Sequence, residues 1–492
     1  MGREGGARLS KSRFMSGMQC HKRLWWEIHE PDADDLEPDP ATQFILDRGK
    51  EVGELARTYV PGGVLIDVPH VERERRLRET AGALKSGAKV LYEPAFEHDR
   101  VLVLADILKR ERGGWTLIEV KSSTKLKPEH LPDLAVQAHV LRGAGIKVLR
   151  TELMHLNREC RHPDLSNLFT REDCTEEVEE VLPGIPGEVR TLQRVLRGPL
   201  PEVEPGDHCT EPWECPFMDR CWPEPPRHAI ETLYRLSRYR RDEYREQGFG
   251  TILDLPGDEE LNPIQERQRR AARKNSLVVE KGLGAALEAL ERPLAFLDFE
   301  TVGPPVPVWK GCRPYDQVPV QLSVHRETPG GRVVHHEWLA EGPGDPRGAV
   351  ASKLLEFTRG ARTILAYNAT FERRCVRDLA EHLSGPAERL GEVEERIVDL
   401  LPIVRDHVYH PEFRGRFGLK SVAPCLVPGL DYEDLEIGEG GEAAQILFML
   451  LLRENSLKKS EKARLRRGLL KYCKTDTLAL LKLHRSLEAL AP

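Results

Sequence analysis

Four cysteines that lie far apart in the sequence restrict how the first half of the chain can fold. Cys20 stands alone near the N-terminus, whereas Cys209, Cys215 and Cys221 form a tight run between prolines much later. In a reducing compartment, clustered cysteines are typical ligands of a metal or of a metal cluster. If the four thiols share one site, the segment between them has to fold as a unit whose two ends meet.

The composition indicates a folded protein with more than one domain. At 492 residues the chain is long enough for two or three domains, each with its own core. Its 40% hydrophobic and 31% charged residues exclude a disordered or fibrous chain. The longest apolar runs, 101–104 and 446–452, are too short to cross a bilayer, and the N-terminus has no apolar signal core. We therefore expect a cytoplasmic protein.

Changes in sequence texture predict three segments and an α/β fold class. Residues 1–225 form one α/β domain that ends in the proline-rich cysteine run, residues 226–290 form a basic helical connector, and residues 291–492 form a second α/β domain. Apolar and alternating runs predict the main elements: strands at 91–96, 101–108, 115–120 and 294–299, and helices at 131–143 and 469–490.

The first candidate site combines Asp106 with Glu119 and Lys121. Asp106 lies near the end of one predicted strand, and Glu119 lies near the end of the next. The strand period of two places Glu119 and Lys121 on the same face. Carboxylates from adjacent strands suit Mg²⁺ or Mn²⁺, which can activate water for phosphodiester cleavage. The alternative is the solvated face of an amphipathic hairpin, because charged residues usually lie at the surface.

Gln137 on the following predicted helix completes the order Asp, Glu-x-Lys, helical Gln. This order resembles the RecB and Cas4 branch of the PD-(D/E)xK nucleases over about residues 8–222. The resemblance implies a restriction-endonuclease-like fold in which Asp106 and Glu119 hold the metal and Lys121 and Gln137 complete the catalytic set. The chain departs from the family at Gly53, where many members carry a metal-binding histidine.

The same family often carries an iron-sulfur cluster on one N-terminal and three C-terminal cysteines. By this resemblance, a [4Fe-4S] cluster would be held by Cys20, Cys209, Cys215 and Cys221. The alternative is tetrahedral zinc, with the same four sulfurs or with His208 in place of one of them.

The second candidate site draws on three segments of the last domain. The strand pattern places Asp298 and Glu300 on one face, where paired carboxylates can bind two cations. A predicted strand-to-helix segment runs from Ile364 to Glu372. On the predicted C-terminal helix, Tyr472 and Asp476 are four residues apart and therefore share a face.

These segments, in this order, resemble the DEDD exonucleases of the RNase H-like superfamily. The resemblance covers about residues 293–490 and is specific to an uncharacterised bacterial domain of that superfamily. It implies that Asp298, Glu300 and Asp476 are metal ligands and that Tyr472 positions the water. Glu372 stands where the family has aspartate, and the extra methylene shifts that candidate ligand.

The connector supplies candidate nucleic-acid contacts. Arg238, Tyr239 and Arg241 lie in a basic run interleaved with tyrosines, which can contact phosphates and stack on bases. Because the net charge is −7, such a surface has to be a local patch. The alternative is a solvated helix whose tyrosines pack on a neighbouring domain.

Together these patterns predict a metal-dependent nuclease with two catalytic domains, acting on DNA in preference to RNA. One rival is a protein in which one site is degenerate and that domain binds or positions nucleic acid. Another is a non-catalytic scaffold or adaptor in which the metal cluster serves folding.

Overall fold

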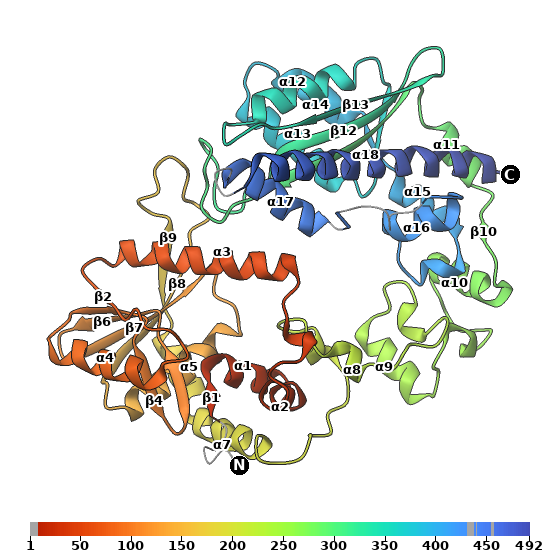
Figure 1. Ribbon diagram of the computed structural model, residues 1–492. Helices are drawn as coiled ribbons and strands as arrows, with labels where there is room; N and C mark the ends of the chain where they lie inside the picture. The colour runs from red at the N-terminus through yellow and green to blue at the C-terminus, as the bar shows by residue number, and fades with distance from the viewer. Residues whose placement is uncertain (1–7, 431–436, 439, 454–456) are drawn as a thin grey trace. The chain divides into compact units, whose positions relative to one another are not determined.

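The computed structural model describes residues 8–430, 437–438, 440–453 and 457–492. Contacts divide the chain into two compact units (Figure 1). Unit 1 comprises Met1–Pro223 with Pro305–Tyr315, and unit 2 comprises Glu224–Pro304 with Asp316–Pro492. Each unit combines helices with β-sheet, so the chain is a mixed α/β protein with several sheets, as the sequence predicts. Among the described residues, no helix is long and apolar enough to cross a membrane.

Unit 1 contains a six-stranded sheet of order β2-β3-β6-β7-β8-β9 and a three-stranded sheet of order β1-β5-β4. Its strands are β1 (Leu9–Ser10), β2 (Val64–Leu65), β3 (Val90–Tyr92), β4 (Ala95–His98), β5 (Val101–Leu104), β6 (Ile107–Glu111), β7 (Gly114–Lys121), β8 (Val148–Leu156) and β9 (Phe169–Asp173). Its helices are α1 (Lys11–Gln19), α2 (His21–His29), α3 (Pro40–Ala56), α4 (Arg73–Lys85), α5 (His130–Gly143), α6 (Thr175–Val181), α7 (Ile185–Val195) and α8 (Met218–Cys221).

Unit 2 contains a five-stranded sheet of order β13-β12-β11-β14-β15 and a two-stranded sheet of β10 and β16. Its strands are β10 (Val278–Val279), β11 (Leu294–Val302), β12 (Val318–Glu327), β13 (Val333–Leu339), β14 (Thr363–Ala366), β15 (Ile397–Asp399) and β16 (Val408–Tyr409). Its helices are α9 (Arg238–Glu246), α10 (Pro263–Lys274), α11 (Leu283–Glu288), α12 (Arg347–Phe357), α13 (Thr370–His382), α14 (Ala387–Glu395), α15 (Leu400–His407), α16 (Leu419–Leu426), α17 (Gly440–Leu452) and α18 (Lys459–Leu490).

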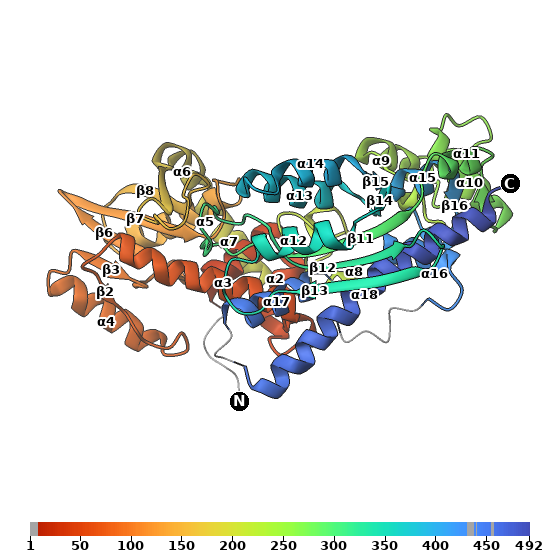
Figure 2. The same cartoon turned by 90° about the horizontal axis from the view of Figure 1, so that it is seen from above.

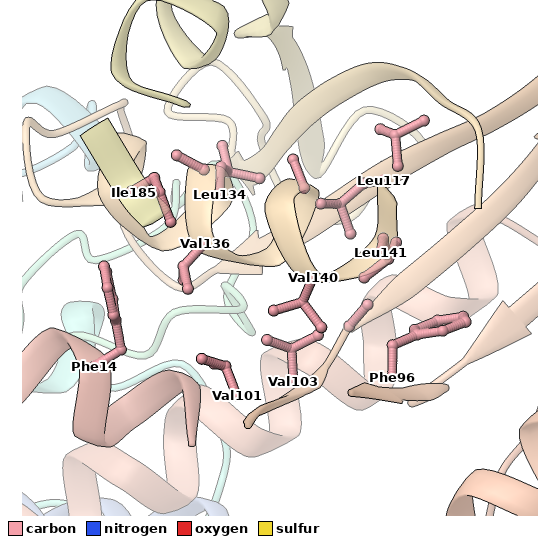
Figure 3. Close-up of a cluster of buried hydrophobic side chains, with 14 of the residues drawn as sticks. Phe14, Phe96, Val101, Val103, Leu117, Leu134, Val136, Val140, Leu141 and Ile185 are labelled. Carbon is pink, nitrogen blue, oxygen red and sulfur yellow. The ribbon is translucent and has the colours of Figure 1, made fainter. Parts of the chain in front are cut away.

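Strand β7 is buried on both faces, and its alternation decides which side chains face helix α5. Leu117 lies in one hydrophobic cluster with Leu134 and Val140 of α5, and Figure 3 shows Val140 pointing toward Val103 of β5 in the same cluster. Ile118 lies in a separate cluster with Ala56 of α3. Because side chains alternate along a strand, Glu119 and Lys121 share the α5 side with Leu117.

The predicted continuous strands 91–96 and 101–108 are wrong, because each is interrupted in the structure. The first breaks between β3 and β4, and the second breaks at residues 105–106 between β5 and β6. The two breaks face each other, since Glu93 N–H donates to Asp106 O at 3.0 Å. At these breaks the chain passes between the two sheets: β3 and β6 belong to the six-stranded sheet, and β4 and β5 belong to the three-stranded one. A chain that changes sheets in this way has to bend. The bend places Asp106 at the edge of the sheet beside β7.

In unit 2, the alternation of β11 separates two hydrophobic layers. Leu297 and Phe299 pack in a cluster with α12, α13 and α14. Phe296 packs in a second cluster with Leu480 and Leu483 of α18. Figure 2 shows α18 and the α12–α13 pair on opposite sides of this sheet. Asp298 and Glu300 therefore share the α18 side with Phe296.

Polar contacts to β12 fix the position of α18 along the sheet. Gln321 donates from Nε2 to the Leu469 carbonyl at 2.8 Å, and the hydroxyls of Ser323 and Thr477 lie 2.8 Å apart. Ser323 is the partner of Asp298 in the β11–β12 ladder. The same contacts that anchor α18 therefore set which of its residues lie over Asp298.

Residues 224–304 pack as part of unit 2. Helix α10 begins with a capping box of Asn262 and Gln265, and its Arg267 is buried. Arg267 donates to the Arg405 carbonyl at 2.7 Å and to Glu280 Oε1 at 3.0 Å. At least one basic side chain of this helix therefore forms hydrogen bonds inside unit 2.

Residues 305–315, which follow β11 in sequence, belong to unit 1. His162 N–H donates to the Cys312 carbonyl at 3.0 Å, and Gly311 N–H donates to the His162 carbonyl at 2.8 Å. Tyr315 donates from its hydroxyl to the Ser122 carbonyl at 2.7 Å. The segment therefore completes unit 1 at the residue that follows Lys121.

Replacing residues 305–315 with a glycine-serine segment of equal length is expected to loosen unit 1. The change removes contacts to His162 and Ser122, and each such hydrogen bond contributes about 1 kcal/mol. Native-state hydrogen exchange should show faster exchange around His162 and around Ser122. The same replacement of residues 328–332, in the β12–β13 turn of unit 2, is the control. Unchanged exchange in unit 1 would contradict the prediction.

Candidate metal centre

Three carboxylates converge in unit 2 from segments that are distant in sequence. Asp298 and Glu300 come from β11, and Asp476 comes from α18. One ligand atom from each lies within 4.8 Å of the other two. Carboxylate oxygens are the ligands that Mg²⁺ and Mn²⁺ prefer, so this group is a candidate metal site.

The neighbours of these carboxylates on α18 and α16 add two groups that the sequence did not single out. Cys473 is buried, and its Sγ donates to Asp298 Oδ2 at 3.2 Å. Lys420 donates from Nζ to the Tyr472 hydroxyl at 3.0 Å, with the ammonium 4.8 Å from the centre of the ring. Lys420 lies on α16, outside the strand and helix motifs that carry the carboxylates, so local periodicity gave no signal for it.

Glu372 lies near the site but outside the three-carboxylate group. Asn368 adopts a φ of 61°, a conformation that asparagine tolerates, and its N–H donates to Asp399 Oδ1 at 2.9 Å. This turn leads from β14 into α13 and puts Glu372 in the first helical turn. The Glu372 side chain is buried, and its Oε2 has no hydrogen-bond partner within the described part of the chain.

Burial and mutual repulsion raise the pKa values of this cluster. Asp298 has a pKa well above its usual range because it is buried and lies near Asp476, Glu300 and Glu372. Burial and Asp476 raise the pKa of Glu300 to about 8, although Lys420 opposes the shift. Burial raises the pKa of Glu372 to about 7. A bound cation would relieve this repulsion.

A groove of about 680 Å³ opens onto the carboxylates. Its walls combine aromatic rings with basic groups. The aromatic and basic residues that line it are Tyr234, Arg235, Tyr367, Arg405, Phe417 and Lys420. Asp298 and Asp476 form part of the same wall. The groove can therefore offer both ring surfaces and positive charge to a molecule that reaches the metal site.

The predicted nucleic-acid contacts lie beside this groove rather than in its lining. Arg238, Tyr239 and Arg241 are on α9, and Tyr239 is 80% exposed. Arg241 donates from Nε to Asp242 Oδ1 at 3.2 Å. The residues of this segment that line the groove are Tyr234 and Arg235, which precede α9.

In unit 1 the structure brings together the four residues that the sequence selects. Gln137 donates from Nε2 to Glu119 Oε2 at 2.8 Å, and Lys121 donates from Nζ to Glu119 Oε1 at 2.8 Å. Asp106 accepts the Val120 N–H at 2.7 Å through Oδ2. Glu119 and Gln137 are both buried.

Asp133 and Lys11 also belong to this cluster, and the sequence analysis missed both. Asp133 Oδ2 accepts from Lys121 at 2.6 Å. Its position four residues before Gln137 on one helix was the available signal. Lys11 donates from Nζ to Glu119 Oε1 at 2.7 Å, but nothing in the local sequence links residue 11 to residue 119.

The two ammonium groups control the ionisation of the unit 1 carboxylates. Burial and Glu119 raise the pKa of Asp106 to about 7, against the opposing effect of Lys11 and Lys121. Burial alone would raise the pKa of Glu119, but Lys11 and Lys121 outweigh it and hold that pKa below its usual range. Glu119 therefore stays ionised.

The four cysteines of the split set line one cavity in unit 1, whose walls include Trp26 and Phe217. Gln19, just before Cys20, donates from Nε2 to the His208 carbonyl at 2.7 Å and to the Trp213 carbonyl at 2.6 Å. These bonds hold the end of α1 against the cysteine run. The two distant parts of the set thus meet, as the sequence predicts.

The spacing of the thiols bears on the choice between zinc and a cluster. Four sulfurs on one tetrahedral zinc lie about 3.8 Å apart, given Zn–S bonds of about 2.3 Å. Among the described residues, two groups have three or more potential ligand atoms within 4.8 Å of one another. They are the Asp298 group and His98, Asp99 and His139, and neither includes a cysteine. Among the described residues, the four thiols therefore do not form a three-ligand group of this kind.

Comparisons with known proteins cover only parts of the chain. Residues 295–418, which include Asp298 and Glu300, match a domain of unknown function, DUF2779. No curated protein matches the chain. Among solved structures, the chain is similar over 40% of its length to the family B DNA polymerase from the hyperthermophilic archaeon Pyrobaculum calidifontis, with 18% identity and a TM-score of 0.26. That similarity spans 27% of the polymerase chain.

Glu300→Gln is expected to stabilise the metal-free protein at high pH. The pKa of Glu300 is raised to about 8 in the fold, so the unfolded chain releases this proton more readily. Stability without metal should therefore fall as the pH rises from about 4 to about 8, and the neutral glutamine avoids this loss.

Thermal unfolding in the presence of a chelator measures the effect. The variant should melt at a higher temperature than the parent at about pH 8, and at nearly the same temperature at about pH 4. Glu288→Gln, an exposed position on α11, serves as the control. Equal melting temperatures at the higher pH would contradict the expected repulsion.

Proposed function

We propose that the protein is a divalent-metal-dependent nuclease that hydrolyses phosphodiester bonds. The observation that carries this proposal is the convergence of Asp298, Glu300 and Asp476, two of which line a groove with rings and basic groups. A Mg²⁺ or Mn²⁺ ion held there would make water nucleophilic and stabilise the developing charge on the phosphate.

The side chains around the ligands have complementary roles in this proposal. Tyr472 has a pKa above its usual range because of burial and Asp476, so its hydroxyl stays protonated. Since Lys420 donates to the hydroxyl oxygen, the hydroxyl hydrogen can point to the attacking water. Glu372, with its buried Oε2, is the proposed fourth acidic group and completes the catalytic set.

The groove supports a nucleic-acid substrate, and we propose DNA in preference to RNA. Tyr234 and Phe417 have their ring centres 5.1 Å apart and offer surfaces on which bases can stack. Arg235 and Arg405 can contact phosphates. Arg238, Tyr239 and Arg241 would extend this contact along α9.

Two finer fold assignments belong to the proposal. The order β13-β12-β11-β14-β15, with β11 antiparallel to β12 and parallel to β14, supports an RNase H-like unit 2 of the DEDD exonuclease type. The approach of Asp106, Glu119, Lys121 and Gln137 supports a restriction-endonuclease-like unit 1 with a second nuclease site. Residues 226–290 would then be a helical connector that is docked on the second domain.

We further propose that Cys20, Cys209, Cys215 and Cys221 hold a [4Fe-4S] cluster, with zinc as the alternative. The four thiols line one cavity, and four thiolates can hold either group. Such a group would fasten α1 and α2 to the end of the domain.

One observation favours a second candidate function for unit 1. Its carboxylates already contact the ammonium groups of Lys11 and Lys121. A unit that needs no added cation could bind or position nucleic acid while unit 2 performs the chemistry. Hydrolysis that depends on Asp298 but not on Asp106 would favour this version.

Asp298→Asn is expected to lower Mn²⁺-dependent hydrolysis by about a hundredfold or more, because it removes a charged metal ligand. End-labelled single- and double-stranded DNA and RNA would be digested in parallel, which also gives the polarity of cleavage. If unit 1 is a second nuclease, some activity should remain in Asp298→Asn, and adding Asp106→Asn should remove it.

Glu288→Gln is the matched control, because it neutralises an exposed carboxylate of the same unit. Its activity should equal that of the parent. If the Asp298→Asn, Asp106→Asn double variant still digests every substrate, neither site performs the reaction and the proposal is wrong.

Cys215→Ser is expected to abolish bound iron and sulfide. Protein purified without oxygen should be brown and absorb visible light, and the variant should lose both properties because one ligand is missing. Cys160→Ser is the control, since Cys160 is buried in unit 1 but does not line the cavity. Stoichiometric zinc without iron or sulfide in the parent would exclude the cluster.

A further inference from the structure

Lys11 brings an ammonium group from a separate element into the unit 1 carboxylates. It is the first residue of α1 and directly follows β1, which pairs with β5. One turn later, Phe14 is buried in the core, and Figure 3 shows its side chain on α1 facing the side chains of α5 and β5. The backbone that carries Lys11 is therefore fixed on both sides.

The donors around Glu119 leave neither of its oxygens unoccupied. Oε1 accepts from Lys11 at 2.7 Å and from Lys121 at 2.8 Å. Oε2 accepts from Gln137 at 2.8 Å. A divalent ion that binds Oε1 therefore has to displace Lys11 or Lys121, because each carboxylate oxygen has two lone pairs and both on Oε1 are taken.

Lys11 is the donor that can leave most easily. Lys121 is held by two short bonds, to Glu119 and to Asp133, and the Gln137 side chain is fully buried. Lys11 makes one short bond to Glu119 and a longer contact of 3.6 Å to Asp133 Oδ1. The two lysine side chains are similarly exposed, 23% for Lys11 and 27% for Lys121, so the weaker second contact is what distinguishes Lys11.

A second feature of the cluster is a buried acceptor without a partner in the described ranges. Oε1 of Gln137 is buried and has no hydrogen-bond partner among residues that the structure describes. An amide oxygen in that position can coordinate a hard cation or bond to a water of its hydration shell. It lies on the same side chain whose amide nitrogen binds Glu119.

We propose that Lys11 is a built-in cation of the unit 1 site and competes with divalent ions for Glu119 and Asp133. With Lys11 in place, the carboxylates are largely neutralised and divalent ions bind weakly. When Lys11 swings out, the same carboxylates accept a metal ion. The proposed competition rests on the proposed function in one respect, namely that the unit 1 carboxylates can bind a divalent ion.

Mn²⁺ binding to the full chain tests the competition, because the paramagnetic resonance signal of unbound Mn²⁺ reports how much is bound. The background is Asp298→Asn with Asp476→Asn, which disables the unit 2 site. In this background, the protein with Lys11→Met should bind one Mn²⁺ at least about tenfold more tightly than the protein that retains Lys11. Adding Glu119→Gln should remove the gain.

Lys85→Met is the matched control, since it removes an exposed lysine from α4 of the same unit and should not change the affinity. Unchanged affinity in Lys11→Met, or a gain that survives Glu119→Gln, overturns the proposal. Lys11→Gln, which retains an N–H donor, replaces Lys11→Met if that variant does not fold. If neither folds, Lys11 is a structural residue and the proposal is wrong.

The assay contains no nucleic acid, so its result is independent of nuclease activity. A protein that cleaves nothing can still show the gain in Mn²⁺ affinity. Conversely, an active nuclease without the gain retains the proposed function and loses this inference.

Discussion

Buried negative charge is the constraint on which the rest of this structure depends. Both units gather buried carboxylates around a central strand, where desolvation and repulsion are unfavourable. Unit 1 offsets them with two ammonium groups, and the pKa of Glu119 stays below its usual range. In unit 2 the Lys420 ammonium opposes the shift at Glu300, yet that pKa still reaches about 8. The unit 2 carboxylates therefore gain more from an added cation, which is why that site carries the proposed reaction.

The position of α18 converts this charge into a defined geometry. Gln321 and Ser323 of β12 bind the helix at Leu469 and Thr477, on either side of Tyr472 and Asp476. A helix shifted by one residue would rotate its side chains by about 100° and carry Asp476 away from the strand. The hydrogen bonds from uncharged side chains of β12 thus hold Asp476 close to Asp298, although the two carboxylates repel each other.

Much of the unit 2 site could be predicted because local periodicity carries it. The period of two put Asp298 and Glu300 on one face, and the helical period paired Tyr472 with Asp476. In unit 1 the same periodicity found Glu119 and Lys121, but it did not find the bend that interrupts the strands beside Asp106. Local periodicity could not predict the role of Lys11 or the pairing of His162 with Cys312, because both depend on tertiary contacts between distant residues.

Helix α1 connects two features of unit 1 that have separate chemistry. It begins with Lys11 and is followed directly by Cys20, so about 13 Å of rigid helix joins the ammonium to the cysteine cavity. Gln19 ties the far end of the helix to the cysteine run, and buried Phe14 fixes its middle. A change at the cysteines that shifts α1 along its axis would move Lys11 relative to Glu119.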